Sequence, residues 1–124
     1  MEIGFTGSSK SITKEQTKKM SKMLTTLVPF TLHHGDCEIA DALAHIIAHN
    51  LKQKVVIHPP LDRRKRACCT RAPKDEIRGP KAYLSRNIDI VKETEILIAV
   101  PHGWAEQRRS GTWQTVRHAR LLKK

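Results

Sequence analysis

With 124 residues, 39% of them hydrophobic and 28% charged, the chain is long enough for one domain with a core, which we expect to span residues 1–124. This composition excludes a disordered tail, and no apolar run reaches the roughly 18 residues of a membrane span. Lys and Arg number 23 against 12 Asp and Glu, and the net charge of +11 predicts an anionic partner, either a nucleic acid or a phosphorylated small molecule.

Short apolar runs alternate with stretches of helical periodicity along the chain. The four runs, each bounded by Gly, Pro or polar residues, predict strands at residues 3–6, 30–34, 55–57 and 96–100. The first helix is expected to begin after a capping box formed by Thr13 and Gln16 and to end before Pro29. Further helices are predicted at residues 37–51, around residues 83–91 and at residues 112–122.

Strands that alternate with helices predict an α/β fold, a three-layer Rossmann-like domain with a parallel sheet of about four strands. The strand at residues 96–100 is apolar throughout, as expected for a strand buried on both faces of such a sheet. Residues 61–80 show no periodicity and are predicted to form a long basic loop. Loops of that length in compact domains are usually functional or mobile.

Three of the predicted strands lead into polar loops that contain glycine and precede a helix. These loops are Gly7-Ser8-Ser9-Lys10, His34-Gly35-Asp36-Cys37 and Ser110-Gly111-Thr112. In an open parallel sheet, ligands bind at the carboxyl ends of the strands, and the free amides of helix N-termini suit phosphate. Each loop alone is equally typical of an ordinary capped turn, but three of them in one small domain favour an anion site.

Several short motifs occur in an order that points to a family. They are Gly4-Phe5-Thr6-Gly7-Ser8, His33-His34-Gly35-Asp36-Cys37 followed by Ala40-Asp41, Arg86-Asn87 ahead of the strand that ends at Pro101, and Ser110-Gly111-Thr112-Trp113. Over nearly its whole length the chain resembles the SLOG superfamily, which includes the YspA-like proteins, the Smf/DprA-type DNA-processing proteins and the LOG phosphoribohydrolases. The resemblance implies a sheet in the order 3-2-1-4, often with a fifth strand beside the fourth.

The resemblance also implies a nucleotide-type pocket lined by the first, second and fourth loops. The positions that carry over are Ser8, Asp36, Asp41, Arg86, Asn87, Gly111 and Thr112. In that pocket Arg86 would clamp a phosphate, and Asp36 or Asp41 would accept hydrogen bonds from ribose hydroxyls. Trp113 is expected either to pack behind the site or to stack on a base.

Three positions depart from the family pattern. The catalytic glutamate of the LOG enzymes, in a Gly-Thr-x-x-Glu pattern, is replaced by Thr115, which cannot support charge at the ribose, although Glu106 lies nearby in the sequence. Ile39 stands where many relatives have glycine, which narrows access at the second loop, and Ser9 stands where an arginine often follows Gly-Ser.

We therefore predict a non-enzymatic SLOG-like domain that senses or sequesters a phosphorylated ribose compound, such as a nucleotide or an NAD-derived molecule. The alternatives are a nucleoside 5′-monophosphate phosphoribohydrolase (an N-glycosidase) and a DprA-like DNA-binding protein. No catalytic residue, metal or cofactor is predicted. The predicted ligand-binding residues are Gly7, Ser8, Ser9, Lys10, Gly35, Asp36, Asp41, Arg86, Asn87, Ser110, Gly111, Thr112 and Trp113.

Other clusters of reactive residues receive structural interpretations. His45 and His49 lie one helical turn apart, with Asp41 one turn earlier, but no further ligand pattern completes a metal site. The adjacent Cys68 and Cys69 are expected to be a buried or incidental pair of thiols. The basic side chains of the long loop form either a solvated surface, a flap over an anionic ligand or a nucleic-acid contact. They are Arg63, Arg64, Lys65, Arg66, Arg71 and Lys74.

The sequence also bears on location and assembly. Three cysteines make no disulfide framework, and residues 1–10 lack the features of a secretory leader, so a cytoplasmic protein is expected. In the order 3-2-1-4 the apolar strand at residues 96–100 would have one neighbour only, and such an edge invites pairing. We therefore predict a homo-oligomer that covers this edge, unless the loop at residues 101–110 folds over it.

Overall fold

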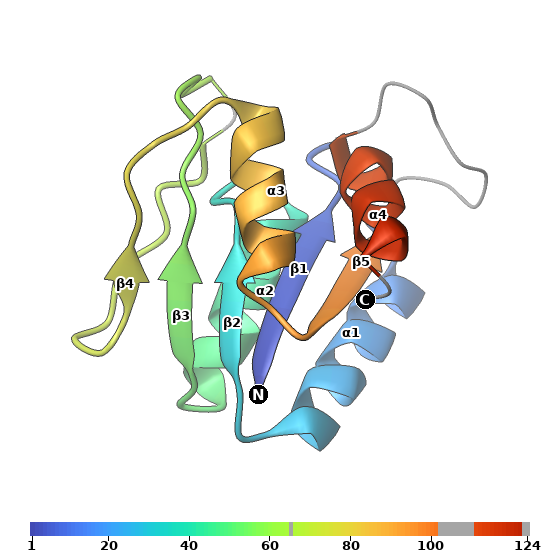
Figure 1. Ribbon diagram of the computed structural model, residues 1–124. Helices are drawn as coiled ribbons and strands as arrows, with labels where there is room; N and C mark the ends of the chain where they lie inside the picture. The colour runs from blue at the N-terminus through green and yellow to red at the C-terminus, as the bar shows by residue number, and fades with distance from the viewer. Residues whose placement is uncertain (65, 102–110, 123–124) are drawn as a thin grey trace.

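The computed structural model describes residues 1–64, 66–101 and 111–122, which form five strands and four helices (Figure 1). The strands are β1 (Glu2–Gly7), β2 (Thr31–His34), β3 (Lys54–Ile57), β4 (Glu76–Ile77) and β5 (Ile96–Val100). The helices are α1 (Lys14–Leu27), α2 (Ala40–Asn50), α3 (Tyr83–Lys92) and α4 (Gly111–Leu121). Each predicted strand and helix is present, with bounds that differ by a few residues.

All five strands are parallel and form one sheet in the order β4-β3-β2-β1-β5. The predicted order of the four main strands is confirmed, because β3-β2-β1-β5 is the expected 3-2-1-4. The additional strand β4 lies within the segment that was predicted to be a loop, and it pairs beside β3 through Val56–Glu76 and Ile57–Ile77. A strand of two residues is too short to show a period of two in the sequence.

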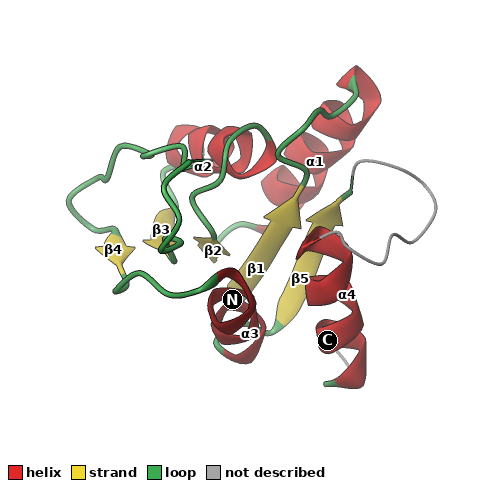
Figure 2. Ribbon diagram, turned by 90° about the horizontal axis from the view of Figure 1, so that it is seen from above, coloured by secondary structure: helices red, strands yellow, loops and turns green. Residues whose placement is uncertain are grey.

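Two helices cover each face of the sheet, so the protein has three layers. Figure 2 shows α1 and α2 on one face and α3 and α4 on the other. The carboxyl ends of the strands all point the same way, toward the upper edge of the sheet in Figure 1. None of the helices in the described ranges combines the length and the apolar character needed to cross a bilayer.

The core lies between the central strands and the α1–α2 layer. Ile3 and Phe5 of β1 and Leu32 of β2 are almost completely buried there. The face of α2 that meets the sheet consists of alanines at intervals of four residues, which allows close approach of its backbone. At the start of α2 the approach is so close that a Cβ on Gly7 would collide with the Cβ of Ala40.

The two N-terminal helices begin differently. The capping box at α1 is confirmed, since the Thr13 hydroxyl accepts a hydrogen bond from the Gln16 amide and Gln16 Oε1 accepts one from the Thr13 amide. By contrast, α2 starts at Ala40 rather than at residue 37 as predicted. The reason is that Asp36 and Ile39 have φ values of 54° and 68°, which lie outside the right-handed helical region.

Strand β5 is less buried than its composition predicted. Ile98 and Val100 are buried, whereas Ile96, Leu97 and Ala99 are only partly covered. The strand lies at the sheet edge, so the expectation of complete burial on both faces is wrong for half of it. The loop that could cover this edge falls at residues 102–110, outside the described residues.

The backbone strain at Ile39 gives a first prediction. An L residue at φ 68° and ψ −95° is strained, and the Ile39 side chain is 41% exposed, so little burial offsets that strain. We expect Ile39→Gly to have a free energy of unfolding about 1 kcal/mol higher than Ile39→Ala. Denaturant unfolding of both variants measures this difference.

The matched control is the same pair of substitutions at the exposed neighbour Glu38, which has no positive φ. There alanine is expected to be at least as stable as glycine. Equal stability of the two Ile39 variants would contradict the strain argument.

Candidate functional site

The guanidinium of Arg86 is buried where the second loop meets α3. Arg86 lies in the first half of α3 and is only 5% exposed. Its Nη1 donates hydrogen bonds to the carbonyl oxygens of Gly35 and of His58, the latter at 3.0 Å. Its Nε donates to Asn87 Oδ1 at 2.7 Å. One side chain thus joins α3 to the ends of β2 and β3.

Glycine is required at position 35 because of this arginine. A Cβ on Gly35 would lie 2.6 Å from the Cζ atom of Arg86 and closer still to Nη1. No side chain fits there unless the guanidinium moves away. Gly35 and Arg86, both predicted as ligand-binding residues, are therefore in direct contact.

Neutral groups provide the hydrogen-bond partners of the buried Arg86 guanidinium. In the part of the chain that the structure describes, none of its hydrogen bonds goes to a carboxylate. The Nη2 group contacts the Cys37 sulfur at 3.7 Å, and the guanidinium lies 5.2 Å from the centre of the Tyr83 ring. A buried guanidinium held by neutral acceptors provides a net positive charge that an anion can neutralise.

Asp41 lies on the other side of the second loop. Its Oδ2 accepts hydrogen bonds from the amides of Gly35 and Cys37, each at 3.1 Å, whereas its buried Oδ1 has no hydrogen-bond partner among the described residues. Burial raises the pKa of Asp41 to about 6, although these two amides and Arg86 act in the opposite direction. Asp41 is thus a carboxylate with one unused oxygen close to a buried cation.

Asp36, which was expected to accept hydrogen bonds from a ribose, binds groups of the protein with both carboxylate oxygens. Its Oδ2 accepts from Arg66 Nε at 2.7 Å and its Oδ1 from the Cys69 amide at 2.9 Å. Burial by itself would raise its pKa, but the hydrogen bonds from Cys69 and Arg66 outweigh that effect, and the pKa lies below its usual value. Because both oxygens are engaged, Asp36 attaches the basic segment to the second loop and leaves Asp41 as the better acceptor for a ligand.

The first loop is held by its own hydrogen bonds. Ser8 Oγ accepts from the amides of Lys10 and Ser11, and Ser8 O accepts from the Ala40 amide at 3.2 Å, which joins this loop to α2. Ser9 is half-buried and Lys10 is exposed. The helix that follows, α1, begins at Lys14 after the predicted cap, so the Gln16 amide at its N-terminus is already bound by the Thr13 hydroxyl.

The fourth loop is described only from its last residues. Gly111 is the first residue of α4, Thr112 is buried and Trp113 is half-buried, while Ser110 and Glu106 lie outside the described residues. Thr115, at the position of the LOG glutamate, is 2% exposed. It lines a groove of about 330 Å³ between α3 and α4, in which Asn87 is the one predicted site residue.

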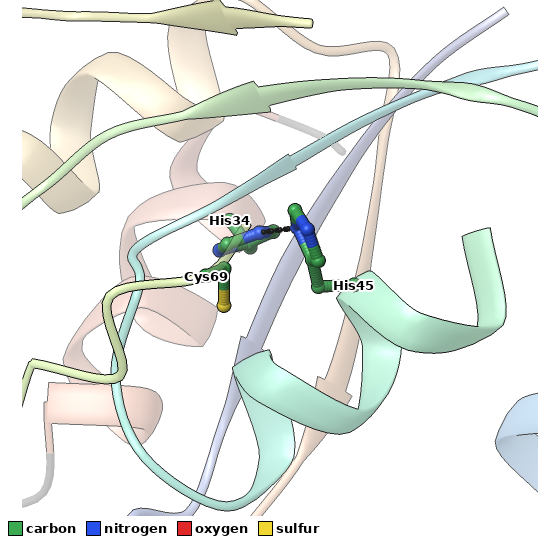
Figure 3. Close-up of side chains that lie close together, drawn as sticks. All are labelled: His34, His45 and Cys69. Carbon is green, nitrogen blue, oxygen red and sulfur yellow. Dashed lines mark hydrogen bonds between the residues drawn. The ribbon is translucent and has the colours of Figure 1, made fainter. Parts of the chain in front are cut away.

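Buried histidines surround the second loop, and the sequence analysis missed their arrangement. His34 Nε2 lies 2.9 Å from His45 Nδ1, and His45 Nε2 lies 2.6 Å from the Thr70 carbonyl (Figure 3). The Asp36 amide donates to His34 Nδ1, so His34 carries its hydrogen on Nε2 and donates it to His45 Nδ1. His45 in turn donates from Nε2 to the Thr70 carbonyl, and both rings are neutral. Burial, followed by the neighbouring His45, lowers the pKa of His34 to about 3.

A second pair lies on the opposite face of the sheet, because adjacent residues of a strand point to opposite faces. His33 Nδ1 is 2.9 Å from His58 Nε2, and His33 Nε2 is 3.1 Å from Glu2 Oε1. Burial and His33 lower the pKa of His58 to about 4. The consecutive pair His33-His34 was the signal in the sequence, but their partners come from distant segments.

His49 does not join Asp41 as the helical spacing suggested. Its Nε2 lies 2.7 Å from Asp75 Oδ2, and Asp75 also accepts from the amides of Val55 and Ala72. The predicted structural role of His45 and His49 therefore agrees with their contacts. Asp75, which ties the long segment to the start of β3, had not been singled out.

Fold and site together define a Rossmann-like parallel α/β protein in which, among the described residues, a buried arginine without a hydrogen-bonded carboxylate lies at the carboxyl edge of the sheet. Among solved structures it is similar to the X-ray structure of TM1055, a structural genomics target, with a TM-score of 0.71 and 12% sequence identity. The match covers 99% of this chain and 70% of that one. No protein-family model and no curated protein matches the sequence.

The raised pKa of Asp41 predicts a pH-dependent stability. The folded state holds the proton more tightly than the unfolded state, so this contribution to stability is complete below pH 3.8 and is lost as the pH rises through about 6. One pKa unit corresponds to about 1.4 kcal/mol, so the full loss is on the order of 3 kcal/mol. Asp41→Asn lacks this titrating group. Relative to wild type, the free energy of unfolding of the variant should therefore rise by on the order of 3 kcal/mol between pH 4 and pH 8.

Denaturant unfolding of both proteins at the two pH values measures this double difference. The depressed pKa values of His34 and His58 affect both proteins alike and cancel. A difference that stays constant between pH 4 and pH 8 would show that Asp41 titrates normally.

Proposed function

We propose that this protein binds a phosphorylated ribose compound, such as a nucleotide or an NAD-derived molecule, at the carboxyl edge of its sheet. The observation that carries the proposal is the Arg86 guanidinium, which is buried against Gly35 without a carboxylate partner in the described part of the chain. A phosphate would supply the missing negative charge. The net charge of +11 favours the approach of such an anion.

We infer that a ribose would be held in the same site through Asp41. Its free Oδ1 can accept a hydrogen bond from a sugar hydroxyl, as acidic residues do in dinucleotide-binding α/β folds. The resemblance of the loop motifs to the SLOG superfamily supports this assignment, and so does the Rossmann-like sheet. We infer a sensing or sequestering role in the cytoplasm, where the free thiols of Cys37, Cys68 and Cys69 would stay reduced.

The two alternative functions draw less support from the geometry. For a phosphoribohydrolase, the position of the catalytic glutamate is the buried Thr115, which offers no carboxylate. For a DNA-binding protein, two of the basic side chains are already engaged, because Arg66 forms an ion pair with Asp36 and Arg64 forms one with Asp62. Arg63 and Arg71 are exposed and would remain for a phosphate backbone.

Calorimetric titration with AMP, ADP-ribose and NAD⁺ tests the proposal. We expect at least one of them to bind, and Arg86→Lys to weaken that binding by about tenfold to a hundredfold, because lysine keeps the charge but loses the fork of donors. Arg64→Gln is the control, since it removes an exposed arginine from the same protein. Circular dichroism shows whether each variant is folded.

The absence of heat with every one of these compounds, from folded wild-type protein, would refute the proposal. Binding of DNA with an affinity that falls steeply with salt, reduced by Arg63→Gln but not by Arg86→Lys, would favour the nucleic-acid function instead. Release of free base from AMP would establish the hydrolase.

We also propose that the chain forms a homodimer through its α3 and α4 face, next to the edge strand β5. Leu84 of α3 is 56% exposed and Leu121 of α4 is 80% exposed, and both line the groove between the two helices. A second copy would cover these side chains. Light scattering of the wild type at micromolar concentration is expected to give a dimer mass.

Leu84→Lys should shift that mass to the monomer, whereas Ile46→Lys should not. Ile46 is 54% exposed but belongs to α2, on the opposite face of the sheet from α3 and α4, and therefore makes a matched control (Figure 2). A monomer mass for the wild type would refute the dimer.

A further inference from the structure

His33, His58 and Glu93 form a cluster between the sheet and the carboxyl end of α3. His33 belongs to β2, His58 follows β3, and Glu93 follows the last residue of α3. One ligand atom from each lies within 4.8 Å of the other two. The imidazoles are buried, whereas the Glu93 side chain is 37% exposed, so the cluster opens to solvent on one side. Two histidines and one carboxylate with an open position form a ligand set typical of zinc.

Glu2 orients His33 so that the lone pair of this imidazole lies on its inner nitrogen, Nδ1. Glu2 Oε1 can only accept, so the hydrogen of neutral His33 resides on Nε2, and Nδ1 carries the lone pair that faces His58 Nε2 at 2.9 Å. A carboxylate that orients a histidine through its far nitrogen is the usual outer partner of a metal-bound imidazole. In the metal-free protein His58 Nε2 donates a hydrogen bond to this lone pair. A metal ion would replace that hydrogen bond, and His58 would then carry its hydrogen on Nδ1 and direct the Nε2 lone pair at the ion.

Glu93 has one oxygen available as well. Its Oε1 accepts from Arg78 Nη2 at 2.8 Å, and Arg78 is also bound by Glu76 at 2.6 Å. Its Oε2 faces His58 Nε2 at 3.7 Å. Two acidic side chains, Glu2 and Glu93, thus lie against the imidazole pair and can balance the charge of a divalent ion.

Hydrogen bonds occupy the ligand atoms of the two other candidate metal clusters in the described part of the chain. His34, His45 and Cys69 lie together (Figure 3), but the Asp36 amide donates to His34 Nδ1, so neutral His34 must keep its hydrogen on Nε2 and has no lone pair to give. In the cluster of His45, His49 and Asp75, His45 Nε2 donates to the Thr70 carbonyl, and Asp75 already accepts three hydrogen bonds.

We propose that His33 Nδ1, His58 Nε2 and Glu93 Oε2 bind one divalent transition-metal ion of the zinc class, with solvent in the remaining position. This site replaces the expectation, based on the spacing of His45 and His49, that the protein has no metal site. Bound there, the ion would link β2, the turn after β3 and the end of α3. The His58 carbonyl also accepts from Arg86, so the ion would brace the backbone that holds the buried arginine.

The test uses chelator-treated, tag-free protein and Co²⁺ as a spectroscopic substitute for Zn²⁺. We expect one Co²⁺ per chain with visible d–d absorption of low coordination number, displaced by one equivalent of Zn²⁺. Because the ion binds the folded state, Zn²⁺ should also raise the melting temperature. Glu93→Gln should abolish or strongly weaken both effects, and His33→Gln should do the same.

Glu95→Gln is the matched control, since it makes the same change at an exposed glutamate two residues away that is not in the cluster. Circular dichroism shows whether each variant folds, and the exposed Glu93 keeps the test valid if the buried His33 variant does not. Cys69→Ser and His49→Gln should bind Co²⁺ like wild type. The site is refuted if wild type binds no Co²⁺, if binding survives in folded Glu93→Gln, or if Co²⁺ gives a thiolate charge-transfer band that Cys69→Ser removes.

Discussion

The contact between the Arg86 guanidinium and the backbone of Gly35 is the constraint on which the site depends. It brings α3 against the ends of β2 and β3 and leaves no room for a side chain at position 35. A buried cation is costly unless its donors are satisfied, and here carbonyl and amide oxygens satisfy most of them without cancelling the charge. The fold thereby maintains a positive centre at the edge of the sheet where Rossmann-like proteins hold their ligands.

The two carboxylates near this centre, Asp36 and Asp41, differ in their hydrogen bonds. Asp36, which the motif suggested as a ligand residue, uses both oxygens to hold Arg66 and the Cys69 amide, so the basic segment is attached to the second loop. Asp41 holds the loop with one oxygen only, and burial raises its pKa to about 6. Two carboxylates five residues apart thus differ in function because their hydrogen-bond partners differ.

The histidines extend the same principle to both faces of the sheet. His33 and His34 are consecutive on β2, so each reaches a different helical layer and a different set of partners. On the α2 side every ring nitrogen of His34 and His45 takes part in a hydrogen bond, in a series that runs from the Asp36 amide to the Thr70 carbonyl. On the α3 side the Glu2 carboxylate places the lone pair of His33 on Nδ1, where it faces His58. The direction of a few hydrogen bonds, rather than the distance between the rings, separates the two clusters chemically.

The sequence by itself determined the alternation of strands and helices and the loops at their carboxyl ends, because these follow from local periodicity. The order of the four main strands was expected only from the resemblance of the loop motifs to the SLOG superfamily. Only the tertiary structure decided the rest. The later start of α2 depends on positive φ angles, and β4 forms because β3 offers an unpaired edge. Arg86 meets Gly35 across 51 positions, and His33 meets His58 across 25. Such contacts leave no local pattern, since they arise from packing between segments that are distant in the chain.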